Sequence, residues 1–249
     1  MTGASNMRIF GASIILIFLA SAAQAAEIRV MAPGLVGPGL NTLIANWQAK
    51  TGNSVVIDKA RTVGRIEDAI AAGGTADLVL LPSGELDGLA GKLKPGSRKK
   101  IGELPFGVAV LTGTPHPDIT SVEKFRDAIK GKSVAYNDPA IGSLAGKMVD
   151  ALLKQPIYAS VKPVPAKTTA GQAVADGVAE MAVAMETEEV TVKGIDIVGP
   201  VPDGIGLKLD LSGAVLANAP HPDEAAAFLA YFNSPEAAPI LKPTGVVVP

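Results

Sequence analysis

Short apolar segments alternate with helix-like segments along the first third of the chain, and this order strongly limits the fold. Ile28–Met31, Val55–Ile57 and Leu78–Leu81 are short runs that are apolar except for Arg29, as expected of buried strands. Leu40–Lys50 and Ile66–Ala72 lie between them, and their apolar residues recur at helical spacing. The pair Gly52-Asn53 is expected to end the first of these helices. Strand–helix–strand order is typical of a parallel sheet with right-handed crossovers. Because the strands are apolar without alternation, we expect helices on both faces of the sheet.

A second series of the same kind follows from Phe106 onward. Its predicted strands are Phe106–Leu111, Ser133–Tyr136, Met181–Ala184, Ile195–Val198 and Leu207–Leu216. Its predicted helices begin near Ser121, Ser143 and Pro222. The predicted fold class is therefore α/β, with two units that each contain a doubly wound, mainly parallel sheet.

The N-terminus has the pattern of a secretory signal peptide. Arg8 precedes the apolar run Ile9–Ala20, and small residues stand at Ala23 and Ala25. This run is too short for a bilayer, which needs about 20 apolar residues, and the small residues suit a signal peptidase. We expect cleavage after Ala25 and, because the chain has no cysteine that could carry a lipid, a free protein in the periplasm of a Gram-negative bacterium. An uncleaved membrane anchor is the alternative interpretation.

Composition argues against several classes of function. The formal net charge is −2, and the densest basic cluster, Arg98–Lys100, is short and follows a Pro95-Gly96 turn. We interpret this cluster as solvated surface, and we expect no nucleic-acid partner because such binding needs a clustered basic face. With no cysteine and only two histidines, a zinc site would depend on carboxylates. We therefore predict neither a metal nor another cofactor.

Three loops lead from the end of a predicted strand into a helix, which is where open α/β sheets bind ligands. They are Ala32–Gly39, Lys59–Gly64 and Asn137–Ser143. Helix N-termini present unpaired N–H groups and a partial positive charge, so several of them at one cleft predict an anion site. Arg61 in the second loop adds a guanidinium suited to a carboxylate or an oxyanion.

The sequence shows no recognisable catalytic motif. His116 and His221 both lie between prolines in loops that we expect to be remote from the cleft, which argues against a Ser-His-Asp triad. No GxxxxGK[ST] phosphate-binding loop is present. An acidic cluster, Glu186, Glu188 and Glu189, follows the strand Met181–Ala184, and we interpret it as a solvated turn. The alternative interpretation is that Glu186 or Thr187 reaches the cleft from the second lobe.

Three segments resemble the type II periplasmic binding proteins and, within them, the molybdate-binding-like group. They are Ala72–Leu80 (AGGTADLVL), Ser133–Ala140 (SVAYNDPA) and Ala226–Ala237 (AAFLAYFNSPEA), the last followed by Thr244-Gly245. The resemblance covers nearly the whole chain after the signal peptide. It implies two lobes joined by two crossings, near Pro105–Val110 and Ile205–Leu211, that close over a small solute held at helix N-termini.

Position by position, the resemblance also implies a ligand-binding set. This set is Pro33, Gly34, Arg61, Thr62, Gly64, Ser83, Asn137, Gly142, Ser143, Met185 and Glu186. Molybdate binders have serine hydroxyls where this chain has Pro33 or Gly34 and Thr62-Val63, and a tyrosine where it has Met185. The loss of these hydroxyls and the presence of Arg61 favour a different anion, such as a carboxylate.

One branch of this group, similar to the chain in Ser121–Ala140 and Ile197–Pro202, includes periplasmic aconitate isomerases. This resemblance implies an alternative function, an enzyme that shifts a double bond between cis- and trans-aconitate. Lys59 or Glu186 would then be the base, and Arg61 would hold a carboxylate. Solute binding is the preferred interpretation because most proteins of this architecture bind rather than react, and the fold alone does not decide.

The predicted organisation is a signal peptide at residues 1–25, a first lobe at 26–107 plus 208–249, and a second lobe at 108–207. About 220 residues remain after the signal peptide, which suits two lobes of ordinary size. We expect a monomer that binds a small anion between the lobes and delivers it to the membrane subunits of an ABC importer.

Overall fold

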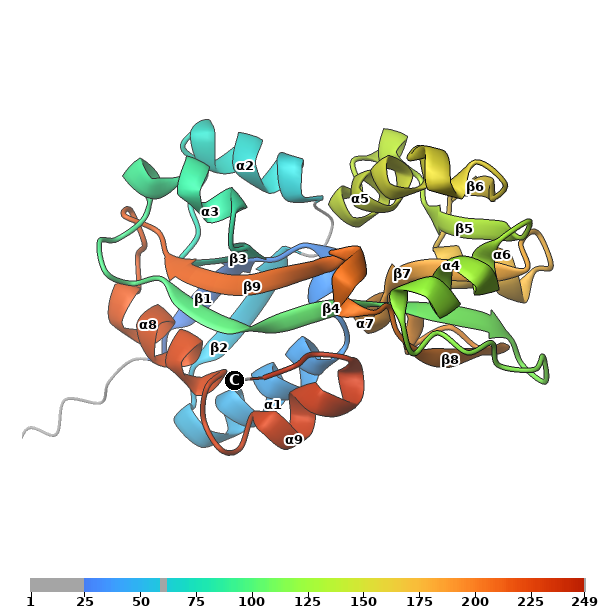
Figure 1. Ribbon diagram of the computed structural model, residues 1–249. Coiled ribbons are helices and arrows are strands. Elements are labelled where there is room, and N and C mark those ends of the chain that lie inside the picture. The colour runs from blue at the N-terminus through green and yellow to red at the C-terminus, as the bar shows by residue number, and fades with distance from the viewer. Residues whose placement is uncertain (1–24, 59–61, 249) are drawn as a thin grey trace, which may run out of the picture.

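The computed structural model has the predicted α/β architecture, with two lobes that share one long strand (Figure 1). The structure describes residues 25–58 and 62–248. The first lobe is built on a sheet in the order β2-β1-β3-β9-β4. Its strands are β1 (Glu27–Met31), β2 (Ser54–Asp58), β3 (Leu78–Pro82), β9 (Lys208–Val215) and the first part of β4 (Lys99–Leu111). β1 is parallel to β2 and β3, whereas β9 is antiparallel to β3 and β4.

Helices cover both faces of the first-lobe sheet, as predicted from its apolar strands (Figure 1). They are α1 (Gly39–Thr51), α2 (Val63–Ala71), α3 (Glu85–Gly88), α8 (Pro222–Tyr231) and α9 (Ala238–Leu241). Helix α1 ends at Gly52 as predicted, in a left-handed conformation (φ 75°) that glycine adopts without strain. The Trp47 ring of α1 lies 5.6 Å from the Phe228 ring and 5.5 Å from the Tyr231 ring, measured between centroids. These aromatic contacts hold α8 against α1.

Strand β4 connects the two lobes. Its residues Lys99–Pro105 pair with β9, and Phe106–Leu111 pair with β7 and β8. On the return path the Val201 N–H donates to the Phe106 carbonyl oxygen at 2.7 Å, between the end of β8 and the start of β9. Because β4 belongs to both lobes, the residue limits given above for the lobes stay a prediction.

The second lobe is built on the strand order β4-β7-β5-β6, with β8 on the other side of β4. Its remaining elements are α4 (Val122–Ile129), β5 (Ser133–Asn137), α5 (Leu144–Leu153), β6 (Lys162–Ala166), α6 (Ala170–Ala175), β7 (Met181–Met185), α7 (Glu186–Glu189) and β8 (Ile195–Pro200). One face of this sheet presents Ala109, Ala135 and Ala182 to α6. These small side chains allow α6 to lie close to the strands.

The structure contains elements that the sequence does not predict, namely β6 and the helices α3, α6, α7 and α9. In addition, β4 begins at Lys99 rather than at Phe106. The basic cluster Arg98–Lys100 is exposed as predicted, although its last two residues belong to the strand, where Lys100 Nζ lies 2.9 Å from Asp210 Oδ1. Among the helices described, none has both the length and the apolar character that a bilayer span requires.

Asp77, immediately before β3, connects three parts of the first lobe. Its side chain is fully buried, with one oxygen accepting from the Arg29 N–H of β1 at 2.8 Å and the other from the His221 N–H before α8 at 2.6 Å. The Asp77 carbonyl oxygen also accepts from the Leu216 N–H at 3.0 Å. The buried aspartate therefore accepts hydrogen bonds from two backbone donors of different segments at partly buried contacts, and hydrogen bonds to a charged acceptor are among the stronger ones.

We expect Asp77→Ala to lower the free energy of unfolding by about 3 kcal/mol, because it removes the acceptor of two partly buried N–H groups. Asp77→Asn is the matched control, since its amide keeps an acceptor oxygen for one of the two donors. It should lower the free energy of unfolding clearly less than Asp77→Ala does. Equilibrium unfolding in urea measures both variants. A change of less than about 0.5 kcal/mol for Asp77→Ala would contradict this role.

Candidate functional site

A cavity of about 250 Å³ lies between the lobes, where the carboxyl ends of the parallel strands meet. The first lobe contributes residues after β1 and at the start of α2, which faces α5 across the cavity (Figure 1). The second lobe contributes the end of β5, the start of α5, the segment before α6, and α7. The lining residues are Pro33, Gly34, Thr62, Val63, Asn137, Ile141, Gly142, Ser143, Leu144, Ala145, Thr168, Thr169 and Glu188. Ligands of open α/β folds bind at this edge of the sheet.

The starts of three helices reach the cavity. Ser143 Oγ accepts from the Gly146 N–H at 2.9 Å and caps α5, and Thr169 Oγ1 accepts from the Gln172 N–H at 3.2 Å and caps α6. A hydroxyl that accepts such a bond still has its own proton to donate. Thr62, which precedes α2, makes no capping bond with its side chain. The cavity wall thus offers hydroxyl and backbone donors from both lobes.

Asn137 and Glu188 form the polar wall in the second lobe. Asn137, at the end of β5, is buried, and its Oδ1 accepts from the Ala170 N–H at the start of α6 at 3.0 Å. This bond directs Nδ2 toward Glu188, whose Oε2 accepts from it at 2.7 Å. Burial raises the pKa of Glu188, while the Asn137 bond acts in the opposite direction. One amide side chain therefore fixes the position of a carboxyl group in the cavity wall.

The two neighbouring glutamates of α7 point elsewhere. Glu189 is 2% exposed, its Oε1 accepts from the Gly171 N–H at 3.1 Å, and its Oε2 has no hydrogen-bond partner among the described residues. Burial raises the pKa of Glu189 to about 7, and the nearby charge of Glu188 acts in the same direction. Glu186 is half-buried against the crossing strand, and burial raises its pKa as well.

Helix α7 of the second lobe rests on glycines of the first lobe and of the shared strand. A Cβ at Gly107 would lie 2.7 Å from Glu186 Cγ, one at Gly245 would lie 2.9 Å from Glu186 Cβ, and one at Gly37 would lie 3.1 Å from Thr187 Cβ. Real Cβ atoms essentially never come as close as the two shorter distances, and the third is tighter than usual, so a larger residue at these positions would require Glu186 or Thr187 of α7 to shift. Close packing here determines which of the α7 side chains faces the cavity.

The structure brings several residues of the predicted binding set together in the cavity wall. These are Pro33, Gly34, Thr62, Asn137, Gly142 and Ser143. Lys59 and Arg61 lie outside the described residues. In the sequence, the segment Lys59-Ala60-Arg61 directly precedes Thr62. Thr168, Thr169 and Glu188 also line the cavity but are absent from the predicted set. The Thr169-x-x-Gln172 spacing, a capping-box signature, is a signal in the sequence that points to the start of α6.

Four members of the predicted set lie away from the cavity wall. Gly64 is exposed in the first turn of α2, and Ser83 Oγ lies 2.7 Å from Ser212 Oγ. Met185 is fully buried at the end of β7, and Glu186 packs against Gly107 as described above. In the described part of α7, Glu188 occupies the position in the wall that the sequence assigns to Glu186.

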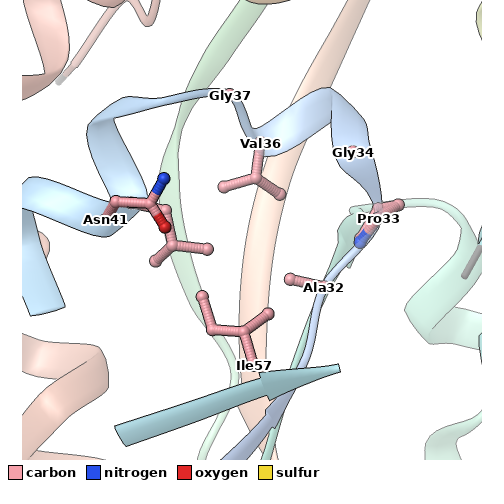
Figure 2. A pocket seen from close by; sticks show the side chains of 8 residues that line it. Ala32, Pro33, Gly34, Val36, Gly37, Asn41 and Ile57 are labelled. Carbon is pink, nitrogen blue, oxygen red and sulfur yellow. The ribbon is translucent and has the colours of Figure 1, made fainter. Parts of the chain in front are cut away.

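A smaller cavity of about 100 Å³ adjoins the first-lobe side of this site and shares Pro33 and Gly34 with it. Figure 2 shows the side chains of Val36 and Ile57 turned toward it, with the Asn41 amide at its edge. Its size limits it to a few atoms, and most of its wall is apolar. Its wall comes from the loop that follows β1, from the start of α1 and from Ile57 of β2.

A third cavity, of about 350 Å³, lies at the opposite ends of the second-lobe strands. Its wall includes Val110, Ala128, Val174 and Met181, and all of it comes from the second lobe and the end of β4. This mainly apolar wall does not combine donors from two lobes. The inter-lobe cavity is therefore the candidate functional site.

Comparison with known proteins identifies the family. The family model of bacterial extracellular solute-binding proteins matches residues 28–247. An aconitate isomerase from a Pseudomonas species is 30% identical over 237 residues, which are 92% of this chain and 90% of that protein. The chain belongs to the bacterial extracellular solute-binding proteins, and the resemblance to periplasmic binding proteins noted from its motifs is confirmed.

Solved structures share the fold at low sequence identity. The periplasmic molybdate-binding protein of Azotobacter vinelandii has a TM-score of 0.68 and 20% identity, covering 89% of this chain and 99% of that chain. A sulfate-binding protein from Mycobacterium tuberculosis has a TM-score of 0.68 and 17% identity, covering 89% and 86%. These likenesses confirm the type II periplasmic binding protein fold.

The buried carboxyl group of Glu189 predicts a distinct pH dependence of stability. Its pKa is about 7 in the folded protein against an ordinary value of 4.5, so folding favours the protonated form. The stabilisation is complete below about pH 4.5 and is lost as the pH rises through 7. Glu189→Gln stays neutral and keeps an acceptor for the Gly171 N–H. We therefore expect the variant to exceed the wild type by about 3 kcal/mol at pH 8 and to match it near pH 4.5.

Urea unfolding of both proteins across this pH range measures the difference. Glu27→Gln is the matched control, because the Glu27 side chain is exposed at the start of β1 and contacts Arg29. If Glu189→Gln lost as much stability as the wild type between these pH values, burial of an ionisable Glu189 would be contradicted.

Proposed function

We propose that this bacterial extracellular solute-binding protein binds a small anion in the cavity between its lobes. The main support for the proposal is that the starts of α2 and α5, one from each lobe, line one cavity together with Thr169, which caps α6. Helix starts present unpaired N–H groups and a partial positive charge. In α6 the first N–H groups already have partners within the protein, so this helix contributes the Thr169 hydroxyl. An anion at this position gains donors from both lobes at once, which favours the arrangement in which the lobes are close together.

The size and chemistry of the cavity support a compact, polar ligand. Its volume of about 250 Å³ lies below the range of about 300–1,000 Å³ typical of drug-sized ligands. Hydroxyl donors from Thr62, Ser143 and Thr169 suit the oxygen atoms of a carboxylate or an oxyanion. The solved relatives named above bind molybdate and sulfate by their names, which supports an anion as the class of ligand.

We infer that Arg61 supplies the full positive charge for this anion. In the sequence it directly precedes Thr62, which lines the cavity at the start of α2, and a guanidinium can donate two parallel hydrogen bonds to a carboxylate. Among the described residues of the cavity wall, none carries a positive charge. A cation from the adjoining segment would compensate the charge of the bound anion.

The family and the N-terminal pattern support a proposal for the cellular role. We propose that the signal peptide is cleaved after Ala25 and that the product is a free periplasmic monomer. It would present the lobe-closed, ligand-bound form to the membrane subunits of an ABC importer. The family match over residues 28–247 begins just after the proposed cleavage point and supports this division of the chain.

A second candidate function is supported by the 30% identity with an aconitate isomerase. Such an enzyme removes a proton from the methylene carbon beside the double bond, shifts the double bond, and returns a proton to the other end of the allylic unit. Glu188 lines the cavity, and the rise of its pKa through burial suits a group that both takes and gives a proton. In this alternative Glu188 is the proton-transfer residue.

We expect a single small anion to raise the melting temperature of the mature protein by mass action. The panel contains molybdate, tungstate, sulfate, phosphate, citrate and the two aconitates, each at millimolar concentration. Calorimetry of the strongest hit then compares Arg61→Ala with the wild type. Loss of a buried, charge-assisted contact of about 1.5–3 kcal/mol predicts binding that is weaker by at least tenfold.

Arg29→Ala is the matched control, because Arg29 is exposed and pairs with Glu27 on β1. It should bind like the wild type. A panel without any shift would contradict the anion-binding proposal, and unchanged affinity of Arg61→Ala would contradict the role of Arg61 alone.

The isomerase alternative predicts turnover by the purified protein without any partner. Incubation with cis-aconitate should produce trans-aconitate, and chromatography measures how much is formed. Glu188→Gln should lower kcat by at least about 100-fold, because its amide cannot accept the proton. Glu27→Gln should retain full activity. Absence of product from either isomer would reject this candidate.

A further inference from the structure

Glu188 is the one residue with an ionisable side chain among the described residues that line the cavity. The polar groups around it are neutral: the Thr62, Ser143 and Thr169 hydroxyls and the Asn137 amide. An ionised carboxylate only accepts hydrogen bonds, and it repels a ligand oxygen that also only accepts them. The position of this one group therefore affects which anions the cavity can hold.

Contacts with the rest of the protein hold the Glu188 carboxyl group in its position. The Asn137 amide is fixed by its bond from the Ala170 N–H at 3.0 Å, so Nδ2 must face Glu188 Oε2, which it does at 2.7 Å. Helix α7 is held by close packing of Glu186 on Gly107 and Gly245. The carboxyl group thus stays in the wall whether or not a ligand is present.

The two neighbouring glutamates, Glu186 and Glu189, do not line the cavity as Glu188 does. Glu189 is directed to the Gly171 N–H of α6, and Glu186 is directed to the shared strand at Gly107. Both are close enough in sequence to add negative charge, and Glu188 raises the pKa of Glu189 for this reason. Negative charge in this turn makes an unprotonated ligand oxygen beside Glu188 still less favourable.

We propose that Glu188 is a specificity-determining residue, which selects anions that present a hydroxyl or a protonated oxygen to its carboxylate. The favoured class is hydroxycarboxylates and hydrogen-bearing oxyanions, and the disfavoured class is anions of the same size whose oxygens are all unprotonated. A donor on the ligand completes a charge-assisted hydrogen bond with Glu188, whereas an analogue without it places two acceptors together. This inference rests on the proposed anion-binding function and specifies the ligand class of the same site.

Matched ligand pairs test this inference by calorimetry at pH 7.5. The pairs are citrate with tricarballylate, malate with succinate, and phosphate with sulfate, and in each the first member carries the extra donor. For the pairs that bind, we expect the wild type to prefer the first member by at least about tenfold, as charged hydrogen bonds typically give. Glu27→Gln should keep this ratio.

Glu188→Gln keeps an acceptor for Asn137 and gains an amide donor. It should therefore bind the two ligands of each pair with affinities within about threefold of each other, chiefly because its affinity for the ligand without the extra donor rises. Glu188→Ala removes the acceptor altogether and should reduce the ratio in the same way. A wild-type preference for the second members, or a ratio that both variants leave unchanged, would overturn the role of Glu188 alone. Absence of binding to all six compounds would overturn the proposed function together with this inference.

Discussion

Strand β4 takes part in both sheets, and the geometry of the candidate site depends on this shared strand. Its first part pairs with β9 and its last part pairs with β7 and β8, so one continuous backbone sets the position of each lobe relative to the other. The Val201 N–H bond to the Phe106 carbonyl holds the returning chain at the same point. As a result, the carboxyl ends of β1, β5 and β7 lead into residues that line one cavity.

Neutral hydrogen-bond donors and several carboxyl groups lie together at the cavity, and burying carboxyl groups in their ionised form costs free energy. Helix starts and hydroxyls make the wall suitable for an anion, yet α7 brings Glu186, Glu188 and Glu189 to the same region. Burial raises the pKa of each of these groups. A site of this kind favours ligands that share a proton with the protein, whether that proton serves recognition or is moved in a reaction. The two candidate functions therefore make use of the same side chain, Glu188.

The sequence predicts the regular parts of the fold well, because apolar periodicity and glycine stops are local signals. Strand β3 and helix α1, with its end at Gly52, are examples. Strand β6 is missed because Lys162-Pro163-Val164-Pro165 lacks a strand pattern, and these prolines are tolerated because β6 is an edge strand. Helix α6 depends on close packing against an alanine face, which is a tertiary effect.

The candidate site is predictable only in its general position. Loops that follow parallel strands indicate Thr62, Asn137 and Ser143, since such loops meet at one edge of the sheet. The choice of Glu188 over Glu186 cannot be made from the sequence, because both belong to one short turn. Contacts with Gly107 and Gly245, which are distant in the chain, decide which of the two faces the cavity.

In the proposed mode of binding, donors from both lobes hold one anion at once, and Glu188 faces a donor of the ligand. A crystal structure of the mature protein with the strongest ligand of the panel would show whether this is so. We expect a ligand in the inter-lobe cavity, bonded to residues at the starts of α2 and α5, with a hydroxyl or protonated oxygen about 2.5–3.0 Å from the Glu188 carboxyl group. A ligand bound by one lobe only, or in the apolar cavity near Met181, would contradict it.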